Sequence, residues 1–276
     1  MEYRMFCYQC EQTAGGKGCT KMGVCGKTPE IANLQDLLIY QLKGISCYAI
    51  NLIEKEELIE ENIISFVENC LFTTLTNVNF DEEVHVDLLK RSQQVKESLR
   101  ERADKSLEYP EQCTYNLSDD KSEMLKDSTR AGIMFDKDLD EDMRSLRMTI
   151  IYGLKGISAY GHQARYLGYR SEEVDLFYFR GLAATTDDNM SMEELIRMVM
   201  RTGEMSTMVM KTLDDANTKS FRNPSPHKVN VRMKKGPFII VSGHDLKDLE
   251  LLLQQTEGTG IHVYTHGEML PAHGYP

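Results

Sequence analysis

The sequence contains no long hydrophobic run and no excess of basic residues. No apolar stretch approaches the roughly 18 residues that a transmembrane helix needs. The opening MEYRMFCYQC lacks the apolar core of an export signal peptide. Lysine and arginine number 32 against 43 aspartates and glutamates, a formal net charge of −11, which argues against a nucleic-acid-binding surface. We therefore expect a cytoplasmic globular protein whose partners include neither a membrane nor a nucleic acid.

The length and composition fit a globular protein of about two domains. Hydrophobic residues make up 41% and charged residues 27% of the 276 positions, which is ordinary for a chain with its own core. Residues 1–27 are rich in Gly and Cys, show no periodicity and are interpreted as a loop. Helical patterns dominate residues 28–222, and residues 228–276 change character. The predicted fold class is mainly α, followed by the beginning of a Rossmann-like parallel α/β domain.

The helical region contains an internal repeat. LIYQLKGISCYA at 38–49 aligns with IIYGLKGISAYG at 150–161, and eight of the twelve positions are identical. Amphipathic composition alone would not reproduce the order Lys-Gly-Ile-Ser. We predict duplicated three-helix bundles, with repeats at about 28–104 and 138–218, joined by a polar linker at 105–137.

Two glycines and one helix start stand out within this region. Glycine inside a helix costs about 1 kcal/mol relative to alanine, so Gly44 and Gly156, which occupy the same place in the two repeats, predict close approach between helices. Ser191 and Glu194 have the spacing of a capping box and predict the start of the last long helix.

The C-terminal region has the pattern of a β-α-β unit. GPFIIVSG (236–243) is a compact apolar run of the kind found in a buried strand, DLKDLELLLQQT (245–256) has helical spacing, and IHVYTH (261–266) predicts a second strand. Two parallel strands need neighbours and cover on both faces. We therefore expect this α/β domain to be incomplete.

Four cysteines lie within 19 residues near the start of the chain, in the pattern C-x2-C-x8-C-x5-C: Cys7, Cys10, Cys19 and Cys25. Thiolates select zinc or iron–sulfur clusters, and clustered cysteines without an export signal are more often metal ligands than disulfides. The wide second pair departs from the two C-x2-C knuckles of most zinc sites. The spacing favours an iron–sulfur cluster, with structural zinc and a disulfide loop as alternatives.

The surroundings of these cysteines suit an anionic cluster. Glycines let the backbone wrap closely around the sulfurs, and the helix predicted from Pro29 directs its positive end toward the loop. Three lysines are placed to offset negative charge: Lys17, Lys21 and Lys27. The remaining cysteines, Cys47, Cys70 and Cys113, have no such neighbours in the sequence and are interpreted as small buried residues without partners.

A histidine and a carboxylate follow the two predicted strands. His244 comes after the first strand and Glu268 lies two residues past the second. Ligands of parallel sheets bind at the carboxyl ends of strands, and imidazole with carboxylate suits iron or zinc. A histidine after a strand is also commonly a helix cap or a surface residue. His262, His266 and His273 offer a rival zinc site with Glu268.

These segments together resemble one family. MFCYQCEQTAGGKGCTKMGVCGKTPEIANLQDLL, the repeated helices, SGHDLKDLELLLQQTEG and THGEMLPAHGYP closely resemble the hybrid-cluster proteins, also called hydroxylamine reductases. The resemblance covers essentially the whole chain. Members of that family have a helical N-terminal domain followed by two α/β domains related to those of carbon monoxide dehydrogenase.

The resemblance implies two metal clusters and an activity. It implies that the four N-terminal cysteines hold a 4Fe-4S cluster, and that His244 and Glu268 are the first two ligands of a hybrid 4Fe-2O-2S cluster. It further implies reduction of hydroxylamine to ammonia, or of nitric oxide, at the hybrid cluster. Electrons would enter through the N-terminal cluster from a ferredoxin-like or flavoprotein donor.

The chain departs from the family pattern in one respect. The family's remaining hybrid-cluster ligands, several cysteines (one a persulfide), a glutamate and a lysine, lie further along its chains, and no cysteine follows Cys113 here. We therefore expect an N-terminal portion that does not build the hybrid cluster by itself. The alternative functions are a non-catalytic electron-transfer or redox-sensing module that uses the N-terminal cluster alone, and a structural zinc domain.

Overall fold

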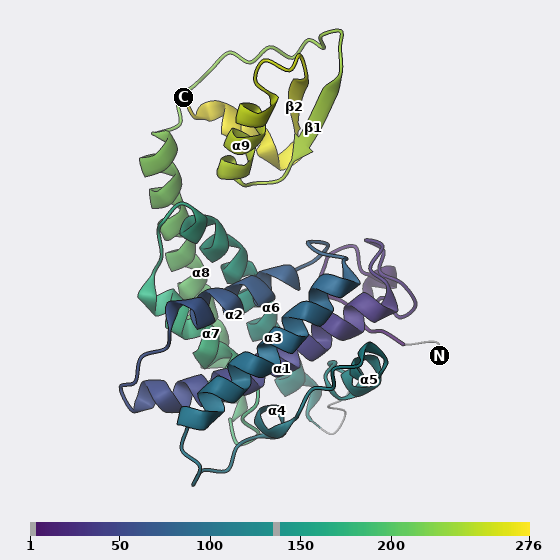
Figure 1. Cartoon of the computed structure of the whole chain (residues 1–276), viewed down its shortest axis with the longest axis vertical. Helices are drawn as coiled ribbons and strands as arrows, with labels where there is room; N and C mark the ends of the chain where they lie inside the picture. The colour runs from purple at the N-terminus through teal and green to yellow at the C-terminus, as the bar shows by residue number, and fades with distance from the viewer. Residues whose placement is uncertain (1–3, 135–138) are drawn as a thin grey trace. The chain divides into compact units, whose positions relative to one another are not determined.

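The computed structural model describes residues 4–134 and 139–276 and is mainly helical, with a small parallel sheet near the C-terminus (Figure 1). Positions 135–138, which the predicted linker and second repeat include, lie outside the described residues. The elements are α1 (Pro29–Glu54), α2 (Glu61–Thr73), α3 (Glu82–Arg102), α4 (Glu111–Thr114), α5 (Lys121–Asp127), α6 (Glu141–Tyr166), α7 (Glu172–Ala184), α8 (Met192–Phe221), β1 (Phe238–Ser242), α9 (Leu246–Thr256) and β2 (His262–His266). Short 3-10 helices lie at Ala14–Gly16, Ser128–Arg130 and Gly267–Gly274. Within the described ranges, no helix combines the length and apolar character that a membrane crossing requires.

The chain divides into two compact units. The first, unit 1, comprises residues 1–162 and 171–209, and the second, unit 2, comprises 163–170 and 210–276. Unit 1 therefore contains the cysteine loop and most of the helices, and unit 2 contains the sheet.

The long helices come in the predicted order, with α1, α2 and α3 before the short helices α4 and α5 and with α6, α7 and α8 after them. Helices α1 and α6 are both 26 residues long, and α2 and α7 are both 13 residues long, whereas α3 has 21 residues and α8 has 30. The predicted capping box is confirmed, because Ser191 Oγ accepts a hydrogen bond from the Glu194 N–H at 3.3 Å and Glu194 Oε2 accepts one from the Ser191 N–H at 2.8 Å.

Helix α1 is the centre of unit 1 and lies beside α3, α4 and α7 (Figure 1). Its leucines and isoleucines are buried on most sides of the helix rather than along one stripe, as expected of a helix enclosed by neighbours. Leu34, Leu38, Leu42, Ile45 and Leu52 are all inaccessible to solvent. Fully burying a side chain of this size contributes roughly 1.5–3 kcal/mol, so α1 contributes much of the stability of unit 1.

Part of the segment predicted as a linker, 105–134, packs against α1. Cys113 of α4 and Met124 of α5 are buried, and both short helices contact α1. A Cβ atom on Gly44 would lie 2.2 Å from the Gln112 carbonyl oxygen, so glycine is what admits α4 here. The linker prediction is therefore wrong for this part, because helices of 4 and 7 residues are too short to show a period.

The prediction of close approach fails at the second repeat glycine. A Cβ atom on Gly156 would meet no described atom within 4 Å. Close packing of α6 falls instead on Gly153, where a Cβ would lie 2.4 Å from Thr202 Cγ2, and on Gly161, where it would lie 2.5 Å from the Tyr178 hydroxyl. The repeat thus preserves the glycine while its neighbours differ.

Lys96 of α3 is a buried cation under α4. Its side chain is 2% exposed, and Nζ donates hydrogen bonds to the carbonyl oxygens of Tyr115 at 2.5 Å and Gln112 at 3.2 Å. Burial lowers the pKa of Lys96 from 10.5 to about 8. Below pH 8 the amine is charged in both folded and unfolded chains. Between about pH 8 and its unfolded pKa, the folded chain binds fewer protons, so this lysine adds stability as the pH rises.

Lys96→Met is therefore expected to remove a pH-dependent part of the stability. The difference in the free energy of unfolding, wild type minus Lys96→Met, should increase by about 1–3 kcal/mol between about pH 8 and pH 10. Urea denaturation at a series of pH values measures the difference. Lys90→Met, at an exposed position of the same helix, should show no such rise. A wild-type-minus-Lys96→Met difference that stays constant with pH would contradict the assignment.

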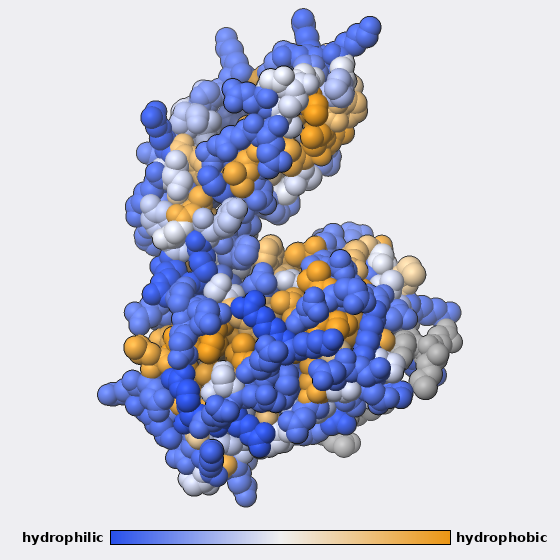
Figure 2. All heavy atoms as spheres, viewed as in Figure 1, coloured by the Kyte–Doolittle hydropathy of each residue, from blue (hydrophilic) through white to orange (hydrophobic). Residues whose placement is uncertain are grey.

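The β-α-β unit of unit 2 is present as predicted. Strands β1 and β2 pair in parallel, with Phe238 opposite His262 and Ser242 opposite His266, and α9 connects them. No residue of α9 is buried. Phe238 and Ile240 are 52% and 63% exposed, and Figure 2 shows hydrophobic residues at the surface in this unit. The sheet therefore lacks the cover that parallel strands require.

Amide hydrogen exchange should distinguish the two units. Because β1, α9 and β2 bury little apolar surface, we expect their amides to exchange at least tenfold faster than those of the enclosed helix α1. Exchange followed by mass spectrometry on the 276-residue chain measures this, and the exposed face of α3 serves as an internal reference. Equal protection of α1 and β1 would show that the small sheet is stable alone.

Candidate metal centres

The N-terminal loop is closed by a backbone bridge between two of the predicted cluster cysteines. The Cys7 N–H donates to the Cys19 carbonyl at 3.1 Å, and the Cys19 N–H donates to the Cys7 carbonyl at 2.8 Å. Cys19 is 3% exposed and packs with Met5 and Ala32, and Cys7 lies against this small cluster. Since Ala32 belongs to the first turn of α1, the helix anchors the loop.

Helix α1 begins directly after the fourth cysteine. Thr28 caps it, with Oγ1 accepting a hydrogen bond from the Ile31 N–H at 3.3 Å, and Pro29 is the first helical residue. Gly26 adopts a φ of 92°, which suits glycine. A Cβ atom on Gly23 would lie 3.0 Å from Cys25 Sγ. These features turn the chain from Cys25 into α1 within a few residues.

The electrostatic surroundings of Cys19 favour a thiolate. The backbone N–H groups of Ala14 and Val24 donate hydrogen bonds to its sulfur and, with the charge of Lys27, hold the pKa of Cys19 below its usual value. Lys27 is 2% exposed, and its Nζ donates to Gln35 Oε1 at 2.5 Å. Of the three lysines that the sequence singled out, Lys27 is the buried one, whereas Lys17 and Lys21 are exposed.

The loop fits an iron–sulfur cluster in its donor set. Four thiols are carried by one short loop, N–H groups already point at one sulfur, and buried cations lie nearby. Cys7 and Cys10 are partly buried and Cys25 is exposed. Within residues 4–134 and 139–276, no three His, Cys, Asp or Glu side chains are gathered at metal-binding distances. Ligation of a cluster by all four sulfurs therefore stays a prediction, which the residue types in this loop support.

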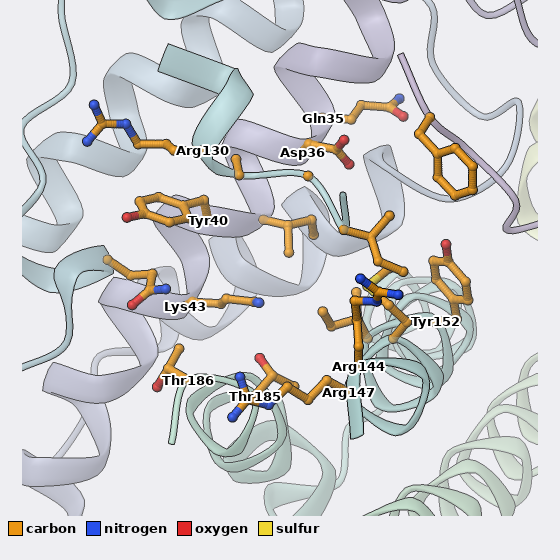
Figure 3. Close-up of a pocket in the computed structure, with 18 of the residues that line it drawn as sticks. Gln35, Asp36, Tyr40, Lys43, Arg130, Arg144, Arg147, Tyr152, Thr185 and Thr186 are labelled. Carbon is orange, nitrogen blue, oxygen red and sulfur yellow. The ribbon is translucent and has the colours of Figure 1, made fainter. Parts of the chain in front are cut away.

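A basic cavity of about 330 Å³ lies in unit 1 (Figure 3), and Cys7 of the loop is among the residues that line it. Lys43 reaches into it from α1, and Arg144 and Arg147 reach into it from α6 (Figure 3). Its charged lining residues are Lys27, Lys43, Arg130, Arg144, Arg147 and Lys155, with Asp36, Glu111 and Asp188. Positive charge beside thiolates favours their ionised form.

Lys155 is a charged neighbour of the loop that the sequence interpretation missed. Its Nζ donates to Gln9 Oε1 at 3.4 Å and to the Thr74 carbonyl at 3.2 Å, and burial lowers its pKa to about 8. In the same cavity, burial raises the pKa of Asp36 to about 6. The signal was present in the repeat, since Lys43 and Lys155 occupy equivalent positions inside otherwise apolar helices.

The second predicted pair is brought together in unit 2. His244 lies two residues beyond β1 and Glu268 two residues beyond β2, and the distance from His244 Nε2 to Glu268 Oε2 is 2.7 Å. Both side chains are largely exposed, 55% and 74%. Of the rival histidines, His273 is engaged with Thr265, its Nε2 lying 2.6 Å from Oγ1. The imidazole and carboxylate can present a nitrogen and an oxygen donor side by side.

The other cysteines differ from one another. Cys70 and Cys113 are buried, as predicted. Cys47 is partly exposed, its Sγ lies 3.3 Å from Thr186 Oγ1, and its thiol interacts with that of Cys113, which itself donates to the Gly44 carbonyl at 3.4 Å. The prediction that these residues have no partners is therefore wrong for Cys47 and Cys113. Their contact joins positions far apart in sequence, which periodicity does not reveal.

Comparison with known proteins decides the family. Residues 5–276 match the model of the Prismane/CO dehydrogenase family. The chain belongs to the Prismane/CO dehydrogenase family. The matched residues include both the cysteine loop and the His244–Glu268 pair.

Relatives within the Prismane/CO dehydrogenase family carry the name hydroxylamine reductase. The protein of that name from Desulfitobacterium hafniense is 46% identical over 279 residues, covering 99% of this chain and 50% of the relative. Those from Methanococcus vannielii and Clostridium tetani are 46% and 42% identical, covering 99% of this chain and 50% and 52% of the relatives. The chain thus spans about half the length of the curated relatives it matches.

Proposed function

We propose that this chain supplies the electron-entry part of an iron–sulfur oxidoreductase that reduces hydroxylamine to ammonia, with nitric oxide as a second candidate substrate. The observation that carries the proposal is the 46% identity to a hydroxylamine reductase over 99% of this chain, including the four-cysteine loop. The reaction cleaves the N–O bond of hydroxylamine, consumes two electrons and two protons, and yields ammonia and water. Such a reaction requires a path for electrons into the protein.

The cysteine loop would provide that path. Cys7, Cys10, Cys19 and Cys25 would hold a 4Fe-4S cluster, which supplies one-electron transfer when bound. The N–H groups that point at Cys19 and the buried amines of Lys27 and Lys155 would stabilise added negative charge and raise the reduction potential. The chain's own contribution is thus to hold the thiolates and tune their surroundings.

A ferredoxin-like or flavoprotein donor is the proposed partner of this loop. Cys25 is exposed, and its neighbours Met22 and Val24 are 58% and 60% exposed. Because Cys25 is exposed, a cluster held by it would lie near the protein surface, where a redox partner can approach it. We place the donor there.

His244 and Glu268 would be the first two ligands of a hybrid 4Fe-2O-2S cluster, which carries the substrate chemistry. Their 2.7 Å separation keeps an imidazole nitrogen and a carboxylate oxygen adjacent. The remaining ligands expected from the family, further cysteines above all, do not occur after Cys113. On this proposal β1-α9-β2 begins a Rossmann-like domain, and helices α1–α3 and α6–α8 are two copies of one bundle.

A chimera tests the proposal. This chain joined to the second half of the Desulfitobacterium hafniense hydroxylamine reductase should bind iron and oxidise a reduced viologen dye in the presence of hydroxylamine. His244→Ala should abolish that activity, and His227→Ala, at an exposed histidine of the same unit, should leave it unchanged. A chimera with its full complement of iron and sulfide but no hydroxylamine turnover would refute the proposal.

A non-catalytic electron-transfer or redox-sensing module is the second candidate. It is favoured by one observation, that all four thiols of the proposed 4Fe-4S cluster lie in a single loop of unit 1. The isolated 276-residue chain should then accept and release electrons without consuming hydroxylamine. Turnover of hydroxylamine by the isolated chain would exclude this candidate.

A further inference from the structure

Cys47 and Cys113 form a pair of thiols in unit 1 that is separate from the cysteine loop. Cys47 lies on α1 and Cys113 on α4, and their thiols interact electrostatically with each other. The Cys113 thiol also contacts the Gly44 carbonyl at 3.4 Å, and Cys47 Sγ lies 3.3 Å from Thr186 Oγ1. The two thiols thus lie in the region where α1 and α4 pack together.

The backbone holds this arrangement in place. At Gly44 the absence of a side chain lets α4 approach so closely that a Cβ would lie 3.1 Å from the Cys113 nitrogen. Cys47 is three residues further along α1 and therefore on the same face of the helix. Tyr48 adds a hydrogen bond from its hydroxyl to the Cys113 carbonyl at 3.4 Å. Both cysteines are positioned by packed elements rather than by loops.

The pair is electrostatically asymmetric. The neighbouring Cys113 thiol, together with Thr186 and the charge of Lys43, lowers the pKa of Cys47 against the opposing effects of burial and Asp187. The same contact and burial raise the pKa of Cys113. Lys96, Tyr48 and Tyr109 are the other titratable groups around the pair. These two directions favour ionisation of Cys47 over ionisation of Cys113.

Exposure is divided in the same way. Cys47 is the more exposed of the two residues, whereas Cys113 is 1% exposed. An attacking thiol and a resolving thiol with these properties are the two parts of a thiol redox site.

We propose that Cys47 and Cys113 constitute a peroxide-sensitive dithiol site that closes to a reversible disulfide. The Cys47 thiolate attacks a hydroperoxide, forming an S–O bond and releasing an alcohol or water as the O–O bond breaks. The Cys113 thiol then attacks the resulting sulfenic acid, forming the S–S bond and releasing water. The two sulfurs lose two electrons in total, which the hydroperoxide accepts. The disulfide ties α4 to α1 and is opened again by a dithiol reductant.

Peptide mapping of the 276-residue chain tests this proposal. Trypsin places Cys47 in the peptide 44–55 and Cys113 in the peptide 106–121, and neither contains another cysteine. After brief treatment with hydrogen peroxide and alkylation, we expect the two peptides joined, with a mass two hydrogens below their sum. Dithiothreitol should release them as separate thiols.

Matched variants separate this pair from the other cysteines. Cys47→Ala and Cys113→Ala should each abolish the joined peptide, and Cys70→Ala should not, since Cys70 is fully buried and burial raises its pKa. Cys113→Ala should also slow iodoacetamide alkylation of Cys47 several-fold in the untreated chain, because the neighbouring thiol that supports the thiolate is lost. Peroxide products confined to sulfinic acids, or an unchanged alkylation rate, would overturn the proposal.

Discussion

Replacing Cys19 by alanine is expected to deprive the purified chain of its four-iron cluster. Cys19 is the buried member of the four cysteines, the one bridged through its backbone to Cys7, and the one that receives N–H donors from Ala14 and Val24. Loss of an outer-shell partner of a metal ligand already costs roughly 10–100-fold in affinity. Loss of the ligand itself should therefore reduce iron and acid-labile sulfide per chain by at least about tenfold.

Iron, sulfide and zinc analysis of anaerobically purified protein measures this effect, with visible absorption as a second readout. Cys70→Ala is the matched control, because Cys70 is equally buried but lies in the helical core rather than in the loop. The Cys19→Ala chain should keep its helical circular dichroism, since Cys19 belongs to a small cluster separate from the main core. Unchanged iron in Cys19→Ala would refute ligation by this residue, and zinc in place of iron in the wild type would replace the cluster with a structural zinc site.

The sequence predicted those elements whose own residues carry the pattern. The repeat around Lys43 and Lys155 predicted two long helices, and α1 and α6 are equal in length. Short apolar runs around a leucine-rich helix predicted β1, α9 and β2. Helices α4 and α5 went unpredicted because they form where α1 offers a surface, at Gly44 among other places, and not from a period of their own.

The candidate sites divide in the same way. Cys7, Cys10, Cys19 and Cys25 are close in sequence, so spacing alone identified them. His244 and Glu268 could be paired because adjacent parallel strands end at one edge of a sheet, a rule that needs topology but no coordinates. Lys155 could have been singled out from the repeat, in which it is the equivalent of Lys43, but the contact of Cys47 with Cys113 depends on which helices pack together. Contacts of that kind are set by tertiary packing, and one sequence carries no local signal for them.

The glycine shared by the two repeats provides the second prediction, that Gly44→Ala destabilises unit 1 by about 3 kcal/mol. The new Cβ would lie 2.2 Å from the Gln112 carbonyl oxygen and 2.7 Å from its carbon, so backbone must move. Overpacking of this kind costs about 1–3 kcal/mol. Displacing Gln112 also weakens the hydrogen bond that Lys96 donates to its carbonyl, and a buried cation deprived of an acceptor costs about 1–3 kcal/mol more. The gain in helix propensity, about 1 kcal/mol, offsets only part of this.

Gly156→Ala is the matched control, with the opposite sign expected. It makes the same chemical change at the equivalent position of α6, but its Cβ would meet no described atom within 4 Å. It should therefore stabilise the chain by about 0.5–1 kcal/mol through helix propensity alone. Urea denaturation followed by circular dichroism measures both variants under one set of conditions. Equal effects would show that the two glycines are conserved features of the repeat with one shared role. Opposite effects would show that only Gly44 is required for packing, because α4 contacts α1 at that residue. The same contact of α4 with α1 brings together the groups around Lys96 and the Cys47–Cys113 pair.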